Sequence, residues 1–268
     1  MQFLPIYNII THVEINFYTG DETSDHSYLS VWKQLEENAH LDMALPFSNA
    51  SIAQYLHSRI PENSALQFSI LNTLRIWDLF SLPQSVHCFS NVGAFGIDGG
   101  LSTLIGQSVV SDDLCFMMIG DLAFYYDMNS IGIRHIKNNL RILLVNNNGG
   151  VEFKYHRQNM ADVNRYIAAG DHFKNARGWS ETCGFRYLCA DSMDGFLKSA
   201  PQFLGESQQP VLLEVFVSDQ DEVEAYRRIV DANTVQTAGE SVKNSIKSSV
   251  KNVLGEKGVQ QLKKLVKK

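Results

Sequence analysis

The sequence of 268 residues lacks the features of several common protein classes. Its four cysteines, Cys88, Cys115, Cys183 and Cys189, form no C-x-x-C pair, so we interpret them as reduced thiols and not as a zinc site or a disulfide framework. No apolar run approaches the ~18 residues of a membrane span. The N-terminal string MQFLPIYNIITHVE shows neither a basic segment nor a small-residue cleavage site. These absences predict a cytoplasmic protein.

Familiar nucleotide and metal motifs are also missing. The sequence has no G-x-x-x-x-G-K-[ST] phosphate loop and no H-E-x-x-H zinc motif. The string NVGAFGIDGG follows a predicted strand, but its glycines (Gly93, Gly96, Gly99 and Gly100) do not fit G-x-G-x-x-G. No acidic residue closes a strand about 20 residues later, as a dinucleotide site requires. A Rossmann-type oxidoreductase using NAD or FAD is therefore disfavoured.

Charge is unevenly distributed along the chain. Residues 237–268 contain eight lysines and two acidic residues, a net charge of +6, whereas the rest carries −12. The acidic globule and the lack of interleaved basic and aromatic residues argue against nucleic-acid binding. The tail could contact an anionic membrane surface, but its apolar stripe is modest and lacks Trp and Phe. We therefore favour docking across a subunit, or a solvated helix.

Apolar strand-like segments alternate with helix-like segments from about residue 48. The predicted strands are 65–71, 85–90, 114–119, 141–145, 185–190 and 210–217, and the predicted helices are 48–59, 72–80, 101–110, 128–139, 179–183 and 193–205. Continuously apolar strands separated by helices predict an α/β fold whose parallel sheet is covered by helices on both faces.

Three regions follow from this pattern. Residues 48–232 form the predicted α/β domain. Residues 1–47 contain a strand-like start, Phe3 to Phe17, and a helix-like YLSVWKQLEENA, and we interpret them as the remnant of a preceding domain or as a linker. Residues 233–268 form a basic tail with apolar residues at helical spacing.

Polar residues follow two of the predicted strands. Asp121 comes after LCFMMIG, and Asn147 comes after RILLVN. Because the carboxyl ends of parallel strands meet at one edge of a sheet, we expect both side chains there. With a carbonyl of the Gly149-Gly150 turn they would supply oxygen ligands for a hard divalent cation, and diphosphate could complete the shell. Each string alone also fits an ordinary turn or loop. Their combination favours a metal–diphosphate site.

The strings GDLAFYYDMN and LLVNNNGG, with Asn147 lying 26 residues after Asp121, resemble the GDG…NN cofactor motif of thiamine-diphosphate-dependent enzymes. Together with SNVGAFGIDGGLSTLIG they resemble the C-terminal domain of SEPHCHC synthase, the carboligase of menaquinone biosynthesis, and the synthase-like proteins of surface-polysaccharide clusters. The resemblance covers roughly residues 46–218. It implies a thiamine-diphosphate-binding fold and a thiamine-diphosphate cofactor with Mg²⁺.

The resemblance also implies roles for individual residues. Asp121 and Asn147 would bind Mg²⁺ through their side chains, and Gly149 through its carbonyl. The remaining implied contacts are with the cofactor: Gly120, Leu122 and Ala123 at the diphosphate, Ile97 as an apolar wedge under the bent cofactor, and Phe153 near the pyrimidine.

The sequence departs from the general cofactor motif at one position and from the synthase pattern at two. Leu122 replaces the third glycine of the general motif, as it does in the synthase subgroup. Val92 stands where the synthase has an arginine thought to hold a substrate carboxylate, and Glu152 stands at an apolar position. Losing a fixed fork of donors argues for a different acceptor substrate.

The resemblance implies only part of an enzyme. In this family a glutamate on a separate pyrimidine-binding domain activates the cofactor, and residues 1–47 are too short to form that domain. We therefore expect the diphosphate- and Mg-binding half of a 2-oxoacid decarboxylase or carboligase. It would be inactive until another chain supplies the pyrimidine-binding domain in a homo- or hetero-oligomer. The alternative is a non-catalytic binding or scaffold remnant of such an enzyme.

No catalytic residue stands out from the sequence. Three weak candidates are Arg75, which could bind a substrate carboxylate, Glu152 beside the reacting centre, and His156 in the loop after the asparagine run. His172 flanks the same loop and could equally transfer a proton near neutral pH. We interpret His135 as a surface or packing residue.

Overall fold

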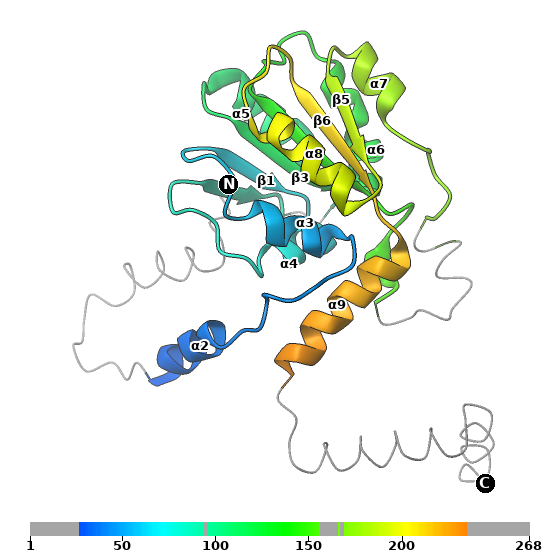
Figure 1. Ribbon diagram of the computed structural model, residues 1–268. Helices are drawn as coiled ribbons and strands as arrows, with labels where there is room; N and C mark the ends of the chain where they lie inside the picture. The colour runs from blue at the N-terminus through cyan, green and yellow to red at the C-terminus, as the bar shows by residue number, and fades with distance from the viewer. Residues whose placement is uncertain (1–26, 94–95, 156–165, 167–168, 235–268) are drawn as a thin grey trace, which may run out of the picture. The chain divides into compact units, whose positions relative to one another are not determined.

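The computed structural model describes residues 27–93, 96–155, 166 and 169–234, which contain a six-stranded parallel sheet (Figure 1). The strand order is β2-β1-β3-β4-β6-β5. Every pair of neighbouring strands is parallel, which confirms the predicted fold class. The strands are β1 (Ala65–Phe68), β2 (His87–Ser90), β3 (Cys115–Gly120), β4 (Leu140–Asn146), β5 (Arg186–Ala190) and β6 (Val211–Phe216).

Helices connect the strands. They are α2 (Ser27–Glu37), α3 (Asn49–Leu56), α4 (Asn72–Trp77), α5 (Gly100–Val110), α6 (Asp121–Asp127), α7 (Arg177–Thr182), α8 (Met193–Leu204) and α9 (Asp219–Asn233), with short 3-10 turns η1 (Met128–Gly132) and η2 (Val151–Phe153). Side-chain caps define two of the starts. Ser48 forms a capping box with Ser51 at α3, and the Ser192 hydroxyl accepts the N–H of Gly195 at α8.

Two apolar clusters cover the two faces of the sheet. One joins residues of α3, α4, α8 and α9 to strand residues such as Phe116, Leu143 and Leu213. The other joins residues of α5, α6 and η1 to the alternate strand residues, such as Met117 and Leu144. Because successive side chains of a strand point to opposite faces, both sets are buried and the strands read as continuous apolar runs. The prediction of helices on both faces is confirmed.

The connection from β3 to β4 differs from the sequence-based prediction. A helix was expected over residues 128–139, but α6 begins at Asp121, directly after β3, and only the 3-10 turn η1 follows it. Ile133 is extended (φ −71°, ψ 147°) and ends that turn. Gly132 lies close to the Trp179 ring, since a Cβ there would be 3.7 Å from Cζ2. Packing against α7 therefore takes the place of a continued helix.

Helix α9 was not predicted, although its start carries a signal. The Ser218 hydroxyl accepts the N–H of Asp221, and acidic residues fill the first turn. Serine followed three residues later by a carboxylate is a helix-start pattern. The chain divides into two compact units, Met1–Ile229 and Val230–Lys268, and the sheet belongs to the first. The predicted strand-like start and basic tail lie outside the described residues. Within the described part of the chain, no helix is both long and apolar enough to span a bilayer.

The carboxyl edge of the sheet has unusual backbone geometry. Leu71, which precedes α4 after β1, has φ 67° and ψ −128°, a combination that is costly for a residue with a side chain. After β4, Asn148 (φ 61°) and Gly149 (φ 154°) also have positive φ. Such conformations persist where the surrounding contacts hold them. They concentrate at the edge where the sequence places the polar site.

Candidate functional site

Asp121 lies at the predicted edge and is almost completely buried, with 2% of its surface exposed. It is the first residue of α6, and Gly120 before it pairs with Val145 of β4. Its Oδ1 accepts the N–H of Leu122 at 2.7 Å, and its Oδ2 accepts the N–H groups of Asn147 at 3.1 Å and Gly149 at 3.0 Å. The tips of β3 and β4 are therefore joined through one carboxylate.

The structure thus brings Asp121, Asn147 and Gly149 together, as the topology predicted. Asn147 is 8% exposed, and its buried Oδ1 has no hydrogen-bond partner among the described residues. Burying an amide oxygen without a hydrogen-bond partner costs free energy, and a bound ion would remove that cost. A carboxylate beside an unpartnered amide oxygen suits a hard cation such as Mg²⁺. The residues present therefore fit the metal implied by the family resemblance.

His172 also contacts Asp121. Its Nε2 lies 2.9 Å from Asp121 Oδ2, and its Nδ1 lies 2.9 Å from the Phe173 carbonyl oxygen. Because both partners can only accept, both ring nitrogens must donate, which requires the protonated imidazolium. Accordingly, the hydrogen bond to Asp121 raises the pKa of His172 above its usual value, against the opposing effect of burial. In this structure the histidine supplies the positive charge beside the carboxylate.

A second buried carboxylate, Glu214 of β6, holds the loop that carries His172. One oxygen accepts the Asn146 amide at 2.8 Å, and the other accepts the Ala176 N–H at 2.8 Å and the Tyr187 hydroxyl at 2.7 Å. Tyr125 of α6 also reaches Glu214, at 3.5 Å, and its ring lies 5.1 Å from that of His172. Burial raises the pKa of both tyrosines, so they remain neutral donors. Sequence reasoning did not identify Glu214, although a lone glutamate in an apolar strand is a signal for such a residue.

The weak catalytic candidates fall into two groups. Arg75 of α4 and Glu152 of η2 form an ion pair across the tips of β1 and β4, so the structure brings them together. The second carboxylate oxygen of Glu152 is buried and has no partner in the described part of the chain. His156 lies outside the described residues. His135 is exposed, which agrees with a surface role.

Some of the remaining predicted cofactor residues lie next to Asp121. Leu122 and Ala123 follow it in α6, and the Leu122 N–H is directed at the Asp121 carboxylate. Ile97 packs against the apolar cluster that includes Ala123. Phe153 is 41% exposed on η2. These positions are compatible with the expected contacts, and the roles themselves stay predictions.

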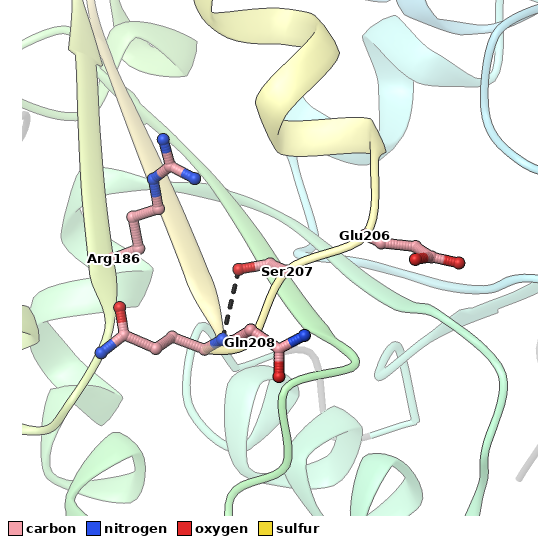
Figure 2. Close-up of a pocket in the computed structure, with 5 residues that line it drawn as sticks. Arg186, Glu206, Ser207 and Gln208 are labelled. Atoms are coloured by element: carbon pink, nitrogen blue, oxygen red, sulfur yellow. Dashed lines mark hydrogen bonds between the residues drawn. The ribbon is translucent and has the colours of Figure 1, made fainter.

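A surface hollow of about 420 Å³ lies away from this site (Figure 2). Arg186, at the start of β5, and residues 206–209, before β6, line it. In Figure 2 the Ser207 hydroxyl accepts the Gln209 N–H, at 3.2 Å. Both segments belong to the amino edge of the parallel sheet, whereas Asp121 lies at the carboxyl edge. None of the predicted site residues lines the hollow.

Known proteins support the resemblance. The chain is 34% identical over 186 residues to the 2-succinyl-5-enolpyruvyl-6-hydroxy-3-cyclohexene-1-carboxylate (SEPHCHC) synthase of Phocaeicola vulgatus, covering 68% of this chain and 33% of that enzyme. It is 37% identical over 180 residues to the synthase of Bacteroides fragilis, covering 65% and 32%. With the synthase of Lysinibacillus sphaericus it shares 27% identity over 234 residues, covering 82% and 39%.

These relatives confirm the resemblance to SEPHCHC synthase, and with it to the thiamine-diphosphate-dependent enzymes. The chain spans about a third of the length of the curated relatives it matches. No protein-family model matches it.

Proposed function

We propose that this homologue of SEPHCHC synthase is the part of a thiamine-diphosphate-dependent 2-oxoacid decarboxylase or carboligase that binds the cofactor's diphosphate through Mg²⁺. The observation that carries the proposal is the unpartnered, buried Oδ1 of Asn147 beside the buried carboxylate of Asp121. The similarity to synthases of several bacteria supports the choice of cofactor.

In this proposal Asp121 and Asn147 hold Mg²⁺ through their side chains, and Gly149 holds it through its carbonyl. Thiamine diphosphate held there would supply a nucleophilic carbon for the decarboxylation or carboligation of a 2-oxoacid. Gly120 and the first turn of α6, at Leu122 and Ala123, face the diphosphate. Ile97 and Phe153 supply apolar contacts to the rings.

The acceptor differs from that of the synthases. Val92 lacks the donors that an arginine would offer to a carboxylate, and Glu152 adds a carboxylate that pairs with Arg75. Because Arg75 is paired with Glu152, its guanidinium is less available to a polycarboxylate acceptor. A smaller or less acidic acceptor, or a proton, suits it better.

The pyrimidine-binding domain that activates the cofactor is supplied by another chain, in a homo- or hetero-oligomer, and the chain alone is inactive. In this proposal the basic tail docks onto such a partner.

A non-catalytic scaffold is the second candidate, and the His172 contact favours it. The imidazolium already satisfies Asp121 Oδ2, so the carboxylate can be stable without a metal ion. A scaffold derived from an enzyme would keep the fold and have no need of the cation.

Titration with Mg²⁺ and thiamine diphosphate tests the proposal, with and without the product of the adjacent gene. Calorimetry should show binding by the parent protein, and Asp121→Ala should weaken it at least about tenfold. Asp112→Ala is the matched control, because Asp112 is fully exposed and precedes β3 at the amino edge. Equal affinity in Asp121→Ala and the parent would refute the metal assignment, and no binding under either condition would favour the scaffold.

A further inference from the structure

Glu222 is a buried carboxylate that the metal site does not use. It lies in the first turn of α9 and is 1% exposed. Its Oε1 accepts the N–H of Asn49, the first residue of α3, at 3.0 Å, and the carboxylate also accepts a hydrogen bond from the Asn72 side chain. Asn72 is the first residue of α4. Glu222 therefore ties α9 to the start of two other helices.

Asn72 connects Glu222 to the loop that follows the asparagine run. Its Oδ1 accepts the hydroxyl of Tyr155, while its amide nitrogen donates to Glu222. The Tyr155 ring stacks on Tyr226 of α9, with centroids 4.3 Å apart and planes at 15°. The Tyr155 side chain is thus held at its hydroxyl end by α4 and on its face by α9.

Two neighbours of Tyr155 are held by the same two helices. Lys154 Nζ lies 3.0 Å from Asp219 Oδ2 of α9, with both side chains largely buried, and Glu152 pairs with Arg75 of α4. Three side chains of the segment 152–155 therefore bind to α4, to α9 or to both. This segment begins three residues after Gly149, whose N–H donates to Asp121. These contacts therefore lie close in sequence to the proposed metal-binding turn.

We propose that Glu222, Asn72 and Tyr155 form a positioning chain of hydrogen bonds through which α9 fixes the loop 149–155. Protonation of Glu222 reverses the donor and acceptor roles in this chain and loosens the loop. With Glu222 ionised, each hydrogen bond in the chain has one donor and one acceptor. When Glu222 is protonated, its O–H turns to the Asn72 oxygen. The Asn72 amide nitrogen then faces the Tyr155 hydroxyl and donates to it, so the chain contains only neutral hydrogen bonds, and the stronger bond to an ionised carboxylate is lost.

The charges around Glu222 place this change near neutral pH. Burial, opposed by hydrogen bonds from Asn49 and Asn72 and reinforced by the carboxylates of Asp121 and Asp221, raises the pKa of Glu222 to about 7. Tyr155 stays neutral because burial and Glu222 raise its pKa, and Arg75 opposes them. His172, whose pKa is raised by its hydrogen bond to Asp121, shares the Asp121 Oδ2 atom with the Gly149 N–H of this loop.

The consequence for the metal rests on the proposed function. A cation on Asp121 would remove the repulsion that Asp121 exerts on Glu222, so binding should favour the ionised form. By linkage, the ionised form should bind the cation more tightly. The positioning chain itself does not depend on the metal and can be tested without it.

Hydrogen exchange of the amides of residues 149–155 tests the chain in the protein without added ligand. At pH 8 the parent should protect these amides about threefold to tenfold more than at pH 6, after correction for intrinsic exchange, as expected for one hydrogen bond.

Tyr155→Phe keeps the stacking on Tyr226 but should lose the protection at both pH values. Glu222→Gln cannot ionise and should show a smaller pH dependence, and any dependence left belongs to His172. Glu224→Gln is the matched control, since Glu224 is a surface residue of α9 paired only with Arg227 and Arg228.

Equal pH dependence in Glu222→Gln and the parent would overturn the proposal, as would full protection in Tyr155→Phe. The same proteins can then be titrated with Mn²⁺. Weaker Mn²⁺ binding at pH 8 by Tyr155→Phe than by Glu224→Gln supports the link to the metal site. If the parent binds no Mn²⁺ while its exchange follows the expected pattern, the proposed function fails and the positioning chain stands.

Discussion

Asn147 donates its backbone N–H to Asp121 Oδ2 at 3.1 Å, while its own side-chain oxygen is buried and has no hydrogen-bond partner among the described residues. Asn147 thus donates to the carboxylate through its backbone and keeps an unused acceptor on its side chain. A cation shared by the two side chains would satisfy that acceptor. The two parts of Asn147 should therefore respond differently to mutation.

Asn147→Ala should weaken Mn²⁺ binding at least about tenfold, because it removes a metal ligand. Without metal it should change the free energy of unfolding by about 1 kcal/mol or less, because the lost oxygen has no partner. Calorimetry and urea unfolding measure the two effects, and Asn138→Ala, at an exposed turn, is the control. A large loss of stability with unchanged metal affinity would show that the side chain is structural.

Glu214→Gln should destabilise the fold by about 2–4 kcal/mol, because the fully buried carboxylate accepts hydrogen bonds from four groups and an amide has only one accepting oxygen. The loss is measured by urea unfolding. Tyr187→Phe removes only one of these donors and should cost about 1 kcal/mol. If both variants cost the same, Glu214 does not act as the centre of the network.

The positions of Asp121, Asn147 and Gly149 could be predicted from sequence because a parallel sheet fixes them. Each follows a continuous apolar strand, and the register pairs Gly120 with Val145. Nothing comparable fixes the partners of Glu214 or Glu222. Their contacts come from loops and helix starts far away in sequence, such as Ala176 and Asn49. Side-chain chemistry alone does not specify such pairings.

Local structure was harder to predict where tertiary contacts outweigh propensity. Residues 128–139 have helical spacing, yet η1 ends at Gly132, which packs close to Trp179. The contact of His172 with Asp121 spans 51 residues and a loop with positive φ at Ala169 and Asp171. Neither could be read from a single stretch of sequence.

His172 should make stability depend on pH. Its folded pKa is raised above the usual 6.5 by the bond to Asp121, so its contribution is fully present below the unfolded pKa and is lost as pH rises through the folded value. His172→Ala should therefore lower the free energy of unfolding more at pH 5.5 than at pH 8.5. His135→Ala, at an exposed site, should have the same small effect at both. Equal effects of pH in the two variants would contradict the ion pair.

Glu222 should give a second pH dependence, over a different window. Because the folded pKa is raised to about 7 from the usual 4.5, the native state binds a proton more tightly than the unfolded state. The free energy of unfolding of the parent should therefore rise as pH falls from about 7 toward 4.5, by on the order of 1–3 kcal/mol from this group. Glu222→Gln should lack this rise, and it should be at least as stable as the parent at pH 8, where the parent carries a buried charge. Urea unfolding of both proteins and of Glu224→Gln across pH 4.5–8 measures the difference. If Glu222→Gln follows the parent at every pH, Glu222 is not the group that titrates, and the loop 149–155 must owe any change near neutral pH to His172.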